Sequence, residues 1–235
     1  MLEFATRAGA TPDALRRAFD AVDPEPIIAL LEPLATDERR DRLRSVAALR
    51  LGSVTVVMDA PHDPHNGAAV LRSCDAFGVQ RVHVVERTES FRARGAVAKG
   101  SENWVDVVRH AHVKDAVSEL SRNGFVLVGT HPEGELVPSE LARIDRLALV
   151  MGNEHDGICE ALRAACRRHV RIPMRGFVES LNVSVSAATL LAYAAMERPG
   201  DLEPGERRRL YARWLTLSVP RGLEILAARQ LALPL

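Results

Sequence analysis

Short apolar runs rich in β-branched residues alternate with amphipathic stretches through the middle of this 235-residue chain. The runs read VTVVMDA from Val54, RVHVVE from Arg81, FVLVGTH from Phe125, RLALVMG from Arg146 and HVRIPM from His169. Strands that are apolar on both faces are typical of a parallel sheet with helices on both sides. Helical patterns fill the sequence between most of these runs, over residues 66–76, 113–123, 158–168 and 182–197. We therefore predict an α/β domain built on a parallel sheet.

Helical patterns also dominate both ends of the chain. The first 48 residues contain three of them, with Thr11 and Thr36 as candidate N-caps. A linker rich in Pro and Gly runs from Arg198 to Gly205, and two more helical patterns follow it. The sequence is therefore expected to divide into an N-terminal helical extension (1–48), the α/β domain (49–198) and a C-terminal helical tail (199–235).

Composition narrows the class of protein. The 31 basic and 31 acidic residues cancel and the apolar content is ordinary, so a folded chain is expected. No apolar run is long enough to cross a bilayer and no secretory signal pattern is present, so we expect a cytoplasmic protein with no membrane segment. Cys74, Cys159 and Cys166 are too scattered for a disulfide framework or a zinc site and are expected to be buried free thiols. The His and Asp residues over 59–65 match no recognised ligand spacing, so no metal is expected.

The placement of arginine matters more for partners than the net charge does. A neutral chain argues weakly against a nucleic-acid partner. The arginines gather, however, on the helical ends, at Arg39, Arg40, Arg42, Arg44 and Arg50 and at Arg207, Arg208, Arg209 and Arg213. Each cluster is either a solvated helix face paired with acids or a surface that contacts phosphate. The sequence leaves both interpretations open.

Three segments of the α/β part carry the candidate chemistry. They are NGAAVLRSCDAFG over 66–78, LALVMGNEHDGI over 147–158 and IPMRGFVESLNVS over 172–184. No G-x-G-x-x-G follows the first strand, which excludes the common dinucleotide-binding loop. Loops at the carboxyl ends of parallel strands are where such sheets bind ligands. We therefore expect the residues after three strands, at 130–131, 152–157 and 172–181, to share one site.

Each polar position also has a purely structural interpretation. Ser180 or Asn182 can cap the helix that follows, and Asn66 can cap the helix over 66–76. The glycines can serve the turns alone, and Arg72 can form a surface ion pair with Asp75. Residues alone do not decide between these interpretations and a ligand site.

In their order and spacing, the three segments resemble the SpoU branch of the SPOUT RNA methyltransferases. That branch carries N…R before an FG turn, then G-x-E-x-x-G, then I-P-M-x-G…S-L-N-V-S. DPHN at 63–66, KGSENWV at 99–105 and VGTH at 128–131 further resemble its tRNA guanosine-2′-O-methyltransferase (TrmH) subgroup. The resemblance covers about 39–196. It implies a parallel-sheet SPOUT domain with a deep C-terminal trefoil knot, S-adenosylmethionine as cofactor, tRNA as partner and a homodimer.

The resemblance also implies a reaction and the residues for it. The reaction is 2′-O-methylation of a guanosine in tRNA, at position 18 of the D-loop; the alternatives are a 23S rRNA guanosine and RNA binding without catalysis. Catalytic roles fall on Arg72, Asn66, Glu154, Ser180 and Asn182. Cofactor contacts fall on Thr130, His131, Gly152, Asn153, Gly157, Ile172, Met174 and Leu181. Lys99 and Ser101 are candidate RNA contacts.

Arg72 needs a physical interpretation of its own. The pKa of an arginine exceeds about 12, so its side chain is a poor base. We interpret Arg72 as a clamp on an RNA phosphate that favours the developing alkoxide, with the phosphate or water taking the proton.

Overall fold

The computed structural model describes residues 12–86, 103–153, 155–231 and 233–234. Its contacts divide the chain into two compact units, one of residues 51–199 and one that combines 1–50 with 200–235. The helices of the two chain ends thus belong to one unit. The three-part division of the sequence into 1–48, 49–198 and 199–235 stays a prediction.

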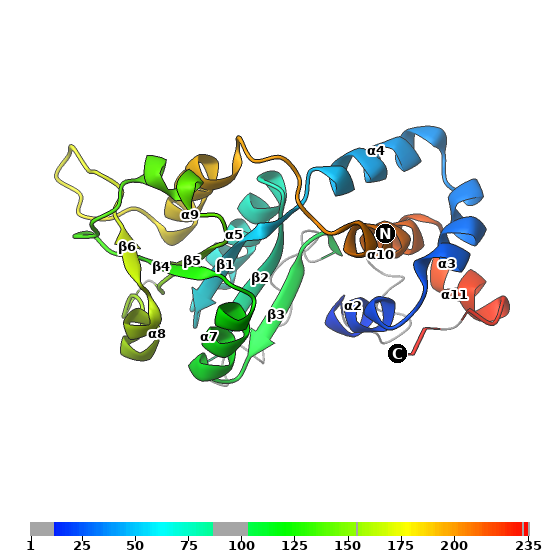
Figure 1. Ribbon diagram of the computed structural model, residues 1–235, viewed down its shortest axis with the longest axis horizontal. Helices are drawn as coiled ribbons and strands as arrows, with labels where there is room; N and C mark the ends of the chain where they lie inside the picture. Colours follow the sequence, from blue (N-terminus) through cyan, green and yellow to red (C-terminus); the bar gives the residue numbers. More distant parts are fainter. Residues whose placement is uncertain (1–11, 87–102, 154, 232, 235) are drawn as a thin grey trace. The chain divides into compact units, whose positions relative to one another are not determined.

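Six parallel strands form the sheet of the 51–199 unit, in the order β3-β2-β1-β5-β4-β6 (Figure 1). The strands are β1 (Leu51–Asp59), β2 (Val79–Val85), β3 (Asp106–His110), β4 (Val126–Thr130), β5 (Leu147–Met151) and β6 (Arg168–Val170). The predicted α/β class with a parallel sheet is confirmed. The prediction missed β3, because this edge strand has only two apolar residues, Val107 and Val108, and polar residues at its other positions.

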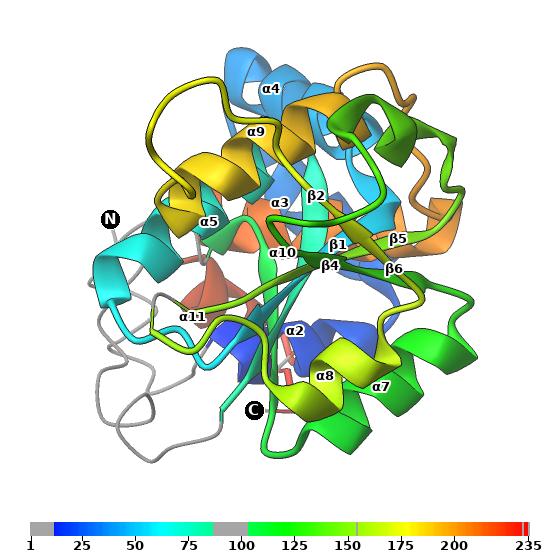
Figure 2. The same cartoon turned by 90° about the vertical axis from the view of Figure 1, so that its left-hand side faces the viewer.

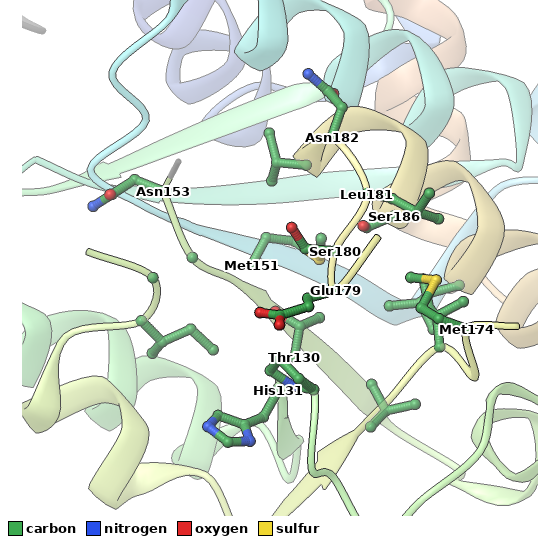
Figure 3. Close-up of a pocket in the computed structure, with 18 residues that line it drawn as sticks. Thr130, His131, Met151, Asn153, Met174, Glu179, Ser180, Leu181, Asn182 and Ser186 are labelled. Atoms are coloured by element: carbon green, nitrogen blue, oxygen red, sulfur yellow. The ribbon is translucent and has the colours of Figure 1, made fainter. Parts of the chain in front are cut away.

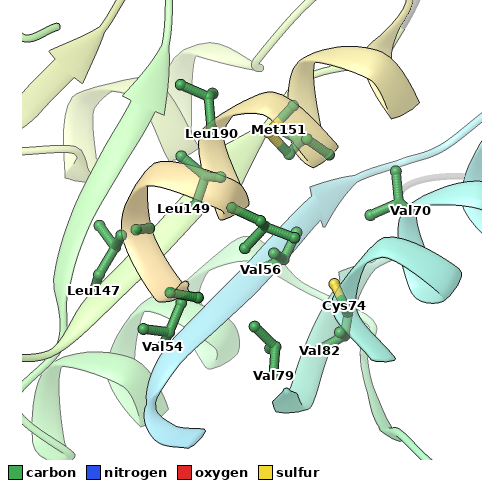
Figure 4. Packing of buried hydrophobic residues seen from close by; sticks show 14 of the residues in the cluster. Val54, Val56, Val70, Cys74, Val79, Val82, Leu147, Leu149, Met151 and Leu190 are labelled. Carbon is green, nitrogen blue, oxygen red and sulfur yellow. The ribbon is translucent and has the colours of Figure 1, made fainter. Parts of the chain in front are cut away.

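Helices cover both faces of this sheet (Figure 2). One face carries α5 (Pro64–Ala76) and α9 (Val183–Ala195), and the other carries α7 (Val113–Arg122) and α8 (Glu160–Ala165). Neighbouring residues of β1 therefore enter different cores. Val56 packs toward Cys74 and Leu190 (Figure 4), whereas Val57 packs in the cluster with Leu120. Burial on both faces is the reason that the strands read as continuous apolar runs.

The short helix α8 departs from the prediction. It spans six residues instead of the predicted 158–168, because Cys159 and Cys166 at its two ends have extended backbone. Cys74 is buried as expected, but Cys159 and Cys166 are only partly buried. Desolvation raises the pKa of Cys166 to about 11, so this thiol is protonated at neutral pH.

The other unit is a small helical bundle around α10 (Pro204–Ser218). Its other members are α2 (Pro12–Asp20), α3 (Pro24–Leu31), the 3₁₀ turn η1 (Glu32–Leu34), α4 (Asp37–Ala48) and α11 (Gly222–Ala228). Every residue of α10 from Leu210 to Thr216 is buried, because α2, α3, α4 and α11 all pack on this helix. Thr36 caps α4 as predicted, with its hydroxyl oxygen 3.2 Å from the Arg39 amide nitrogen. Thr11 lies outside the described residues.

Several arginines of the two predicted clusters pair with acids inside this bundle. Ion pairs join Arg40 to Asp37, Arg44 to Glu32, Arg208 to Glu25 and Arg209 to Asp20. Arg50 is buried and lies 5.2 Å from the centre of the Trp214 ring. For these arginines the interpretation as a paired helix face is favoured, while Arg42 and Arg207 remain exposed to solvent. Among the described residues, no helix is both long and apolar enough to cross a bilayer.

Candidate active site

A pocket of about 420 Å³ opens where β4, β5 and β6 end and α9 begins (Figure 3). Its volume falls within the usual range for small-molecule sites. The structure brings together in its lining every residue predicted to contact a cofactor: Thr130, His131, Gly152, Asn153, Gly157, Ile172, Met174 and Leu181. Ser180 and Asn182 of the predicted catalytic set also line it, whereas Asn66 and Arg72 do not. Glu154 lies outside the described residues, as do Lys99 and Ser101.

The loop after β5 is tied into a closed turn. The backbones of Asn153 and Gly157 exchange two hydrogen bonds of 3.1 and 3.2 Å. A β-carbon at Gly152 would lie 2.4 Å from the carbonyl carbon of Gly157, and Gly157 has a φ of +66°. Both positions therefore require glycine for the turn itself. The Asn153 side chain fixes the turn further, since its Oδ1 accepts hydrogen bonds from the amides of His155 and Asp156 at 2.9 and 2.7 Å.

Asn182 joins the start of α9 to the start of α5. Its Oδ1 accepts a hydrogen bond of 2.8 Å from the Ser184 amide, which makes Asn182, and not Ser180, the N-cap of α9. Its Nδ2 donates to Asn66 Oδ1 at 3.1 Å across 116 residues of sequence. The alternative that Asn66 caps its own helix is wrong, because Asp63 accepts the capping bond of α5.

Arg72 lies on α5 with its side chain exposed to solvent. Six residues of an α-helix turn the chain by about 600°, so Arg72 projects roughly 120° away from Asn66 around the helix. Arg72 is thus exposed to solvent and is not part of the pocket lining of its own chain.

Comparison with known proteins places this arrangement in a family. The model of the SpoU rRNA Methylase family matches residues 53–192, which include the sheet except for the first two residues of β1, the pocket, and α9 up to Ala192. The chain belongs to the SpoU methylase family.

Individual SpoU relatives cover more of the chain. A tRNA (guanosine(18)-2′-O)-methyltransferase of Escherichia coli strain K12 is 36% identical over 161 residues, which are 68% of this chain and 70% of the relative. The crystal structure of the A. aeolicus TrmH/SpoU tRNA modifying enzyme superimposes with a TM-score of 0.66 at 27% identity, over 78% of this chain and 98% of that one. The SpoU methyltransferase AviRb of Streptomyces viridochromogenes, in complex with its cofactor AdoMet, gives a TM-score of 0.54 at 27% identity, over 67% and 63% of the two chains.

The SpoU pocket also contains residues that the sequence motifs did not single out. Ser186 lies one helical turn after Asn182 on the same face of α9, a spacing of four that the sequence already carried. Glu179 adds a carboxylate from the loop before α9, and Leu190 extends the apolar wall. Only the tertiary structure could bring Glu179 to the pocket, because no local pattern predicts where an exposed loop side chain points.

A second carboxylate stabilises the strand that borders the pocket. Both oxygens of Glu135 lie 3.1 Å from the His169 amide at the start of β6. Hydrogen bonds from the backbone amides of Glu135 itself and of His169 lower the pKa of Glu135, so the carboxylate stays ionised through the neutral range. The loop over 131–136 is therefore attached to β6 beside the pocket.

Proposed function

We propose that this chain transfers a methyl group from S-adenosylmethionine to the 2′-hydroxyl of a guanosine in tRNA, at position 18 of the D-loop. The observation that carries the proposal is that three segments far apart in sequence, at 130–131, 152–157 and 172–182, line one pocket. The E. coli relative named for this reaction supports the choice of substrate, because it is 36% identical to the chain over 161 residues.

The lining of the pocket suits the proposed cofactor. S-adenosylmethionine supplies a methyl group on a positively charged sulfur. Met151, Ile172 and Leu181 provide apolar surface for a purine ring, and the Gly152–Gly157 turn exposes backbone groups for its polar edge. Ser180, Ser186 and Asn182 add short polar groups to the lining. We assign cofactor contact to the eight predicted residues on this basis.

The side chains around the pocket would position the ribose and handle its proton. In the proposal Ser180 and Asn182 orient the ribose, and holding the hydroxyl in line with the methyl group supplies much of the rate. Arg72 binds the neighbouring phosphate and stabilises the alkoxide as it develops. The proton leaves to that phosphate or to water. Glu154 is assigned to shaping the pocket.

A homodimer is part of the proposal because one chain does not complete the site. Arg72 does not line its own pocket, while apolar side chains on α9, directly after it and in the loop before it are strongly exposed: Phe177, Val178, Val185, Tyr193 and Met196. A second copy that covers this surface would bring its Arg72 to the first copy's pocket. Mixing an Arg72→Ala chain with a chain whose pocket is blocked by Leu181→Arg tests this. Recovery of about a quarter of the wild-type activity is expected for a two-fold dimer with shared sites, and none if each chain uses its own Arg72.

The deep trefoil knot also belongs to the proposal. It is supported by how tightly the loop after β4 meets the segment after β6: a β-carbon on Gly134 would lie 2.7 Å from the carbonyl carbon of Val170. A crystal structure traced through 126–195 tests it. A chain that leaves β6 without passing through the 131–146 loop would refute the knot and leave the sheet unchanged.

The reaction is tested with unmodified tRNA transcript and methyl-labelled S-adenosylmethionine, followed by mapping of the labelled nucleotide. We expect 2′-O-methylguanosine at position 18. Label on 23S rRNA fragments and not on tRNA would show that the substrate is 23S rRNA instead of tRNA. Cofactor binding without transfer to either RNA would overturn the proposed reaction.

A further inference from the structure

Two buried histidines meet near the β3 edge of the sheet. His83 lies in β2 and His110 ends β3, and they are 2% and 6% exposed. His83 Nδ1 and His110 Nε2 are 2.8 Å apart, the ring planes differ by 15° and the ring centres are 5.1 Å apart. The two rings therefore meet edge to edge, with one nitrogen donating and the other accepting a hydrogen bond. Burying two polar rings in a sheet is costly unless their nitrogens are used.

A carboxylate from the covering helix approaches the same point. Glu119 lies on α7, which packs against β2 and β3 (Figure 1). One carboxylate oxygen of Glu119 and one ring nitrogen of each histidine all lie within 4.8 Å of one another. In the described portion of the chain, no other group of three His, Cys, Asp or Glu side chains brings its ligand atoms this close together.

We propose that His83, His110 and Glu119 form a Zn²⁺ site with a fourth position open to water. Two imidazole nitrogens and one carboxylate oxygen are a donor set that Zn²⁺ takes in tetrahedral geometry. Nitrogen ligands about 2.0–2.1 Å from the ion lie about 3.3 Å apart, so the rings must separate by about 0.5 Å and turn. The Glu119 oxygen lies up to 4.8 Å from the histidine nitrogens, so this half-buried helix side chain must move closer by up to about 1.5 Å. The bound ion would then replace the hydrogen bond as the side-chain link between the two paired strands and add α7 to it.

This site is separate from methyl transfer. None of the three residues lines the pocket at β4, β5 and α9. The proposal therefore does not depend on the proposed function and departs from the expectation that the chain holds no metal. Its effect would be on stability, because an ion that binds only the folded chain stabilises that chain.

The test uses the full chain, stripped with a chelator and titrated with Zn²⁺ by calorimetry, with metal content measured after gel filtration. We expect one ion per chain and a higher melting temperature with Zn²⁺. His110→Gln and Glu119→Gln should each weaken binding by about 100-fold or more, since even outer-shell changes cost 10–100-fold. His112→Gln is the matched control, because His112 is exposed, two residues from His110 and makes no capping bond.

Two results would overturn the proposal: a wild-type chain that binds no Zn²⁺, or Glu119→Gln and His110→Gln chains that bind it as tightly as the wild type. Circular dichroism shows whether His110→Gln folds. If it does not, Glu119→Gln decides alone, because its side chain is only half-buried. Binding of S-adenosylmethionine by Glu119→Gln should equal that of the wild type, which separates failure here from failure of the proposed function.

Discussion

Asn182 allows the capping and linking roles of one side chain to be separated. Its Oδ1 caps α9 and its Nδ2 donates to Asn66. Asn182→Asp keeps an oxygen for the cap but replaces the donor by a second acceptor that faces the Asn66 carbonyl oxygen. Asn182→Ala removes both. Loss of an N-cap costs about 1 kcal/mol and loss of a solvent-accessible hydrogen bond about 1 kcal/mol more. We therefore expect Asn182→Ala to lower the free energy of unfolding by about 2 kcal/mol.

Asn182→Asp should change stability far less, because Asp and Asn cap helices about equally well and a negative charge at a helix N-terminus is favourable. Both variants should nevertheless transfer methyl groups more slowly, since both break the link between the start of α9 and the start of α5. If the poorer positioning raises the activation free energy by about 1.4 kcal/mol, kcat/KM falls tenfold. Asn66→Ala combined with Asn182→Asp should be no worse than the more severe single change, because the two residues share one interaction.

The measurements are urea unfolding followed by circular dichroism and initial rates of methyl transfer to tRNA transcript. Full activity of Asn182→Asp would refute the role of the Asn66–Asn182 link. A stable Asn182→Ala chain would refute the cap. A loss of stability in Asn182→Asp equal to that in Asn182→Ala would show that the carboxylate disrupts more than the link.

The remaining predictions concern Arg72, Arg198 and Tyr211. Arg72→Ala should abolish methyl transfer while the affinity for S-adenosylmethionine, measured by calorimetry, stays at the wild-type value; weaker cofactor binding or misfolding would contradict its role. Arg198→Ala should lower the free energy of unfolding by about 3 kcal/mol, because its guanidinium donates to the carbonyl oxygens of Ile144, Asp145 and Ala194 at 2.5, 2.9 and 2.7 Å. Arg122→Ala on the surface of α7 is the control and should cost under about 0.5 kcal/mol. Burial, and then the hydrogen bond to Glu32, raise the pKa of Tyr211 to about 12, so the wild type should lose stability between pH 10 and 12 as only the unfolded chain ionises, and Tyr211→Phe should lack that loss in urea unfolding.

The sequence alone predicted most of the strands and a candidate site at their carboxyl ends. Val56 and Val57 are both fully buried because the sheet is covered on both faces, and that two-sided burial makes the strands recognisable as apolar runs. Parallel strands all have their carboxyl ends at one edge of the sheet, so the loops after β4, β5 and β6 were expected on the same side. The individual lining residues came from the resemblance to the SpoU branch, and the neighbouring positions of β5, β4 and β6 in the sheet bring them together.

The sequence could not supply the distances across the fold. The segment DVVRH becomes strand β3 only because it pairs with β2, and the local sequence pattern does not show which strand will be its neighbour. The cap of α5 is local, because Asp63 accepts from the His65 amide two residues away. The Asn66–Asn182 bond and the pairing of Arg208 with Glu25 in the helical unit, by contrast, depend on side chains that meet only after packing. The same holds for His83 and His110, which are 27 residues apart in the sequence, although Nδ1 of His83 lies 2.8 Å from Nε2 of His110. Periodicity fixes which face of an element is buried, because each element is local; which residues share a site is decided by the order of strands in the sheet, which is not local.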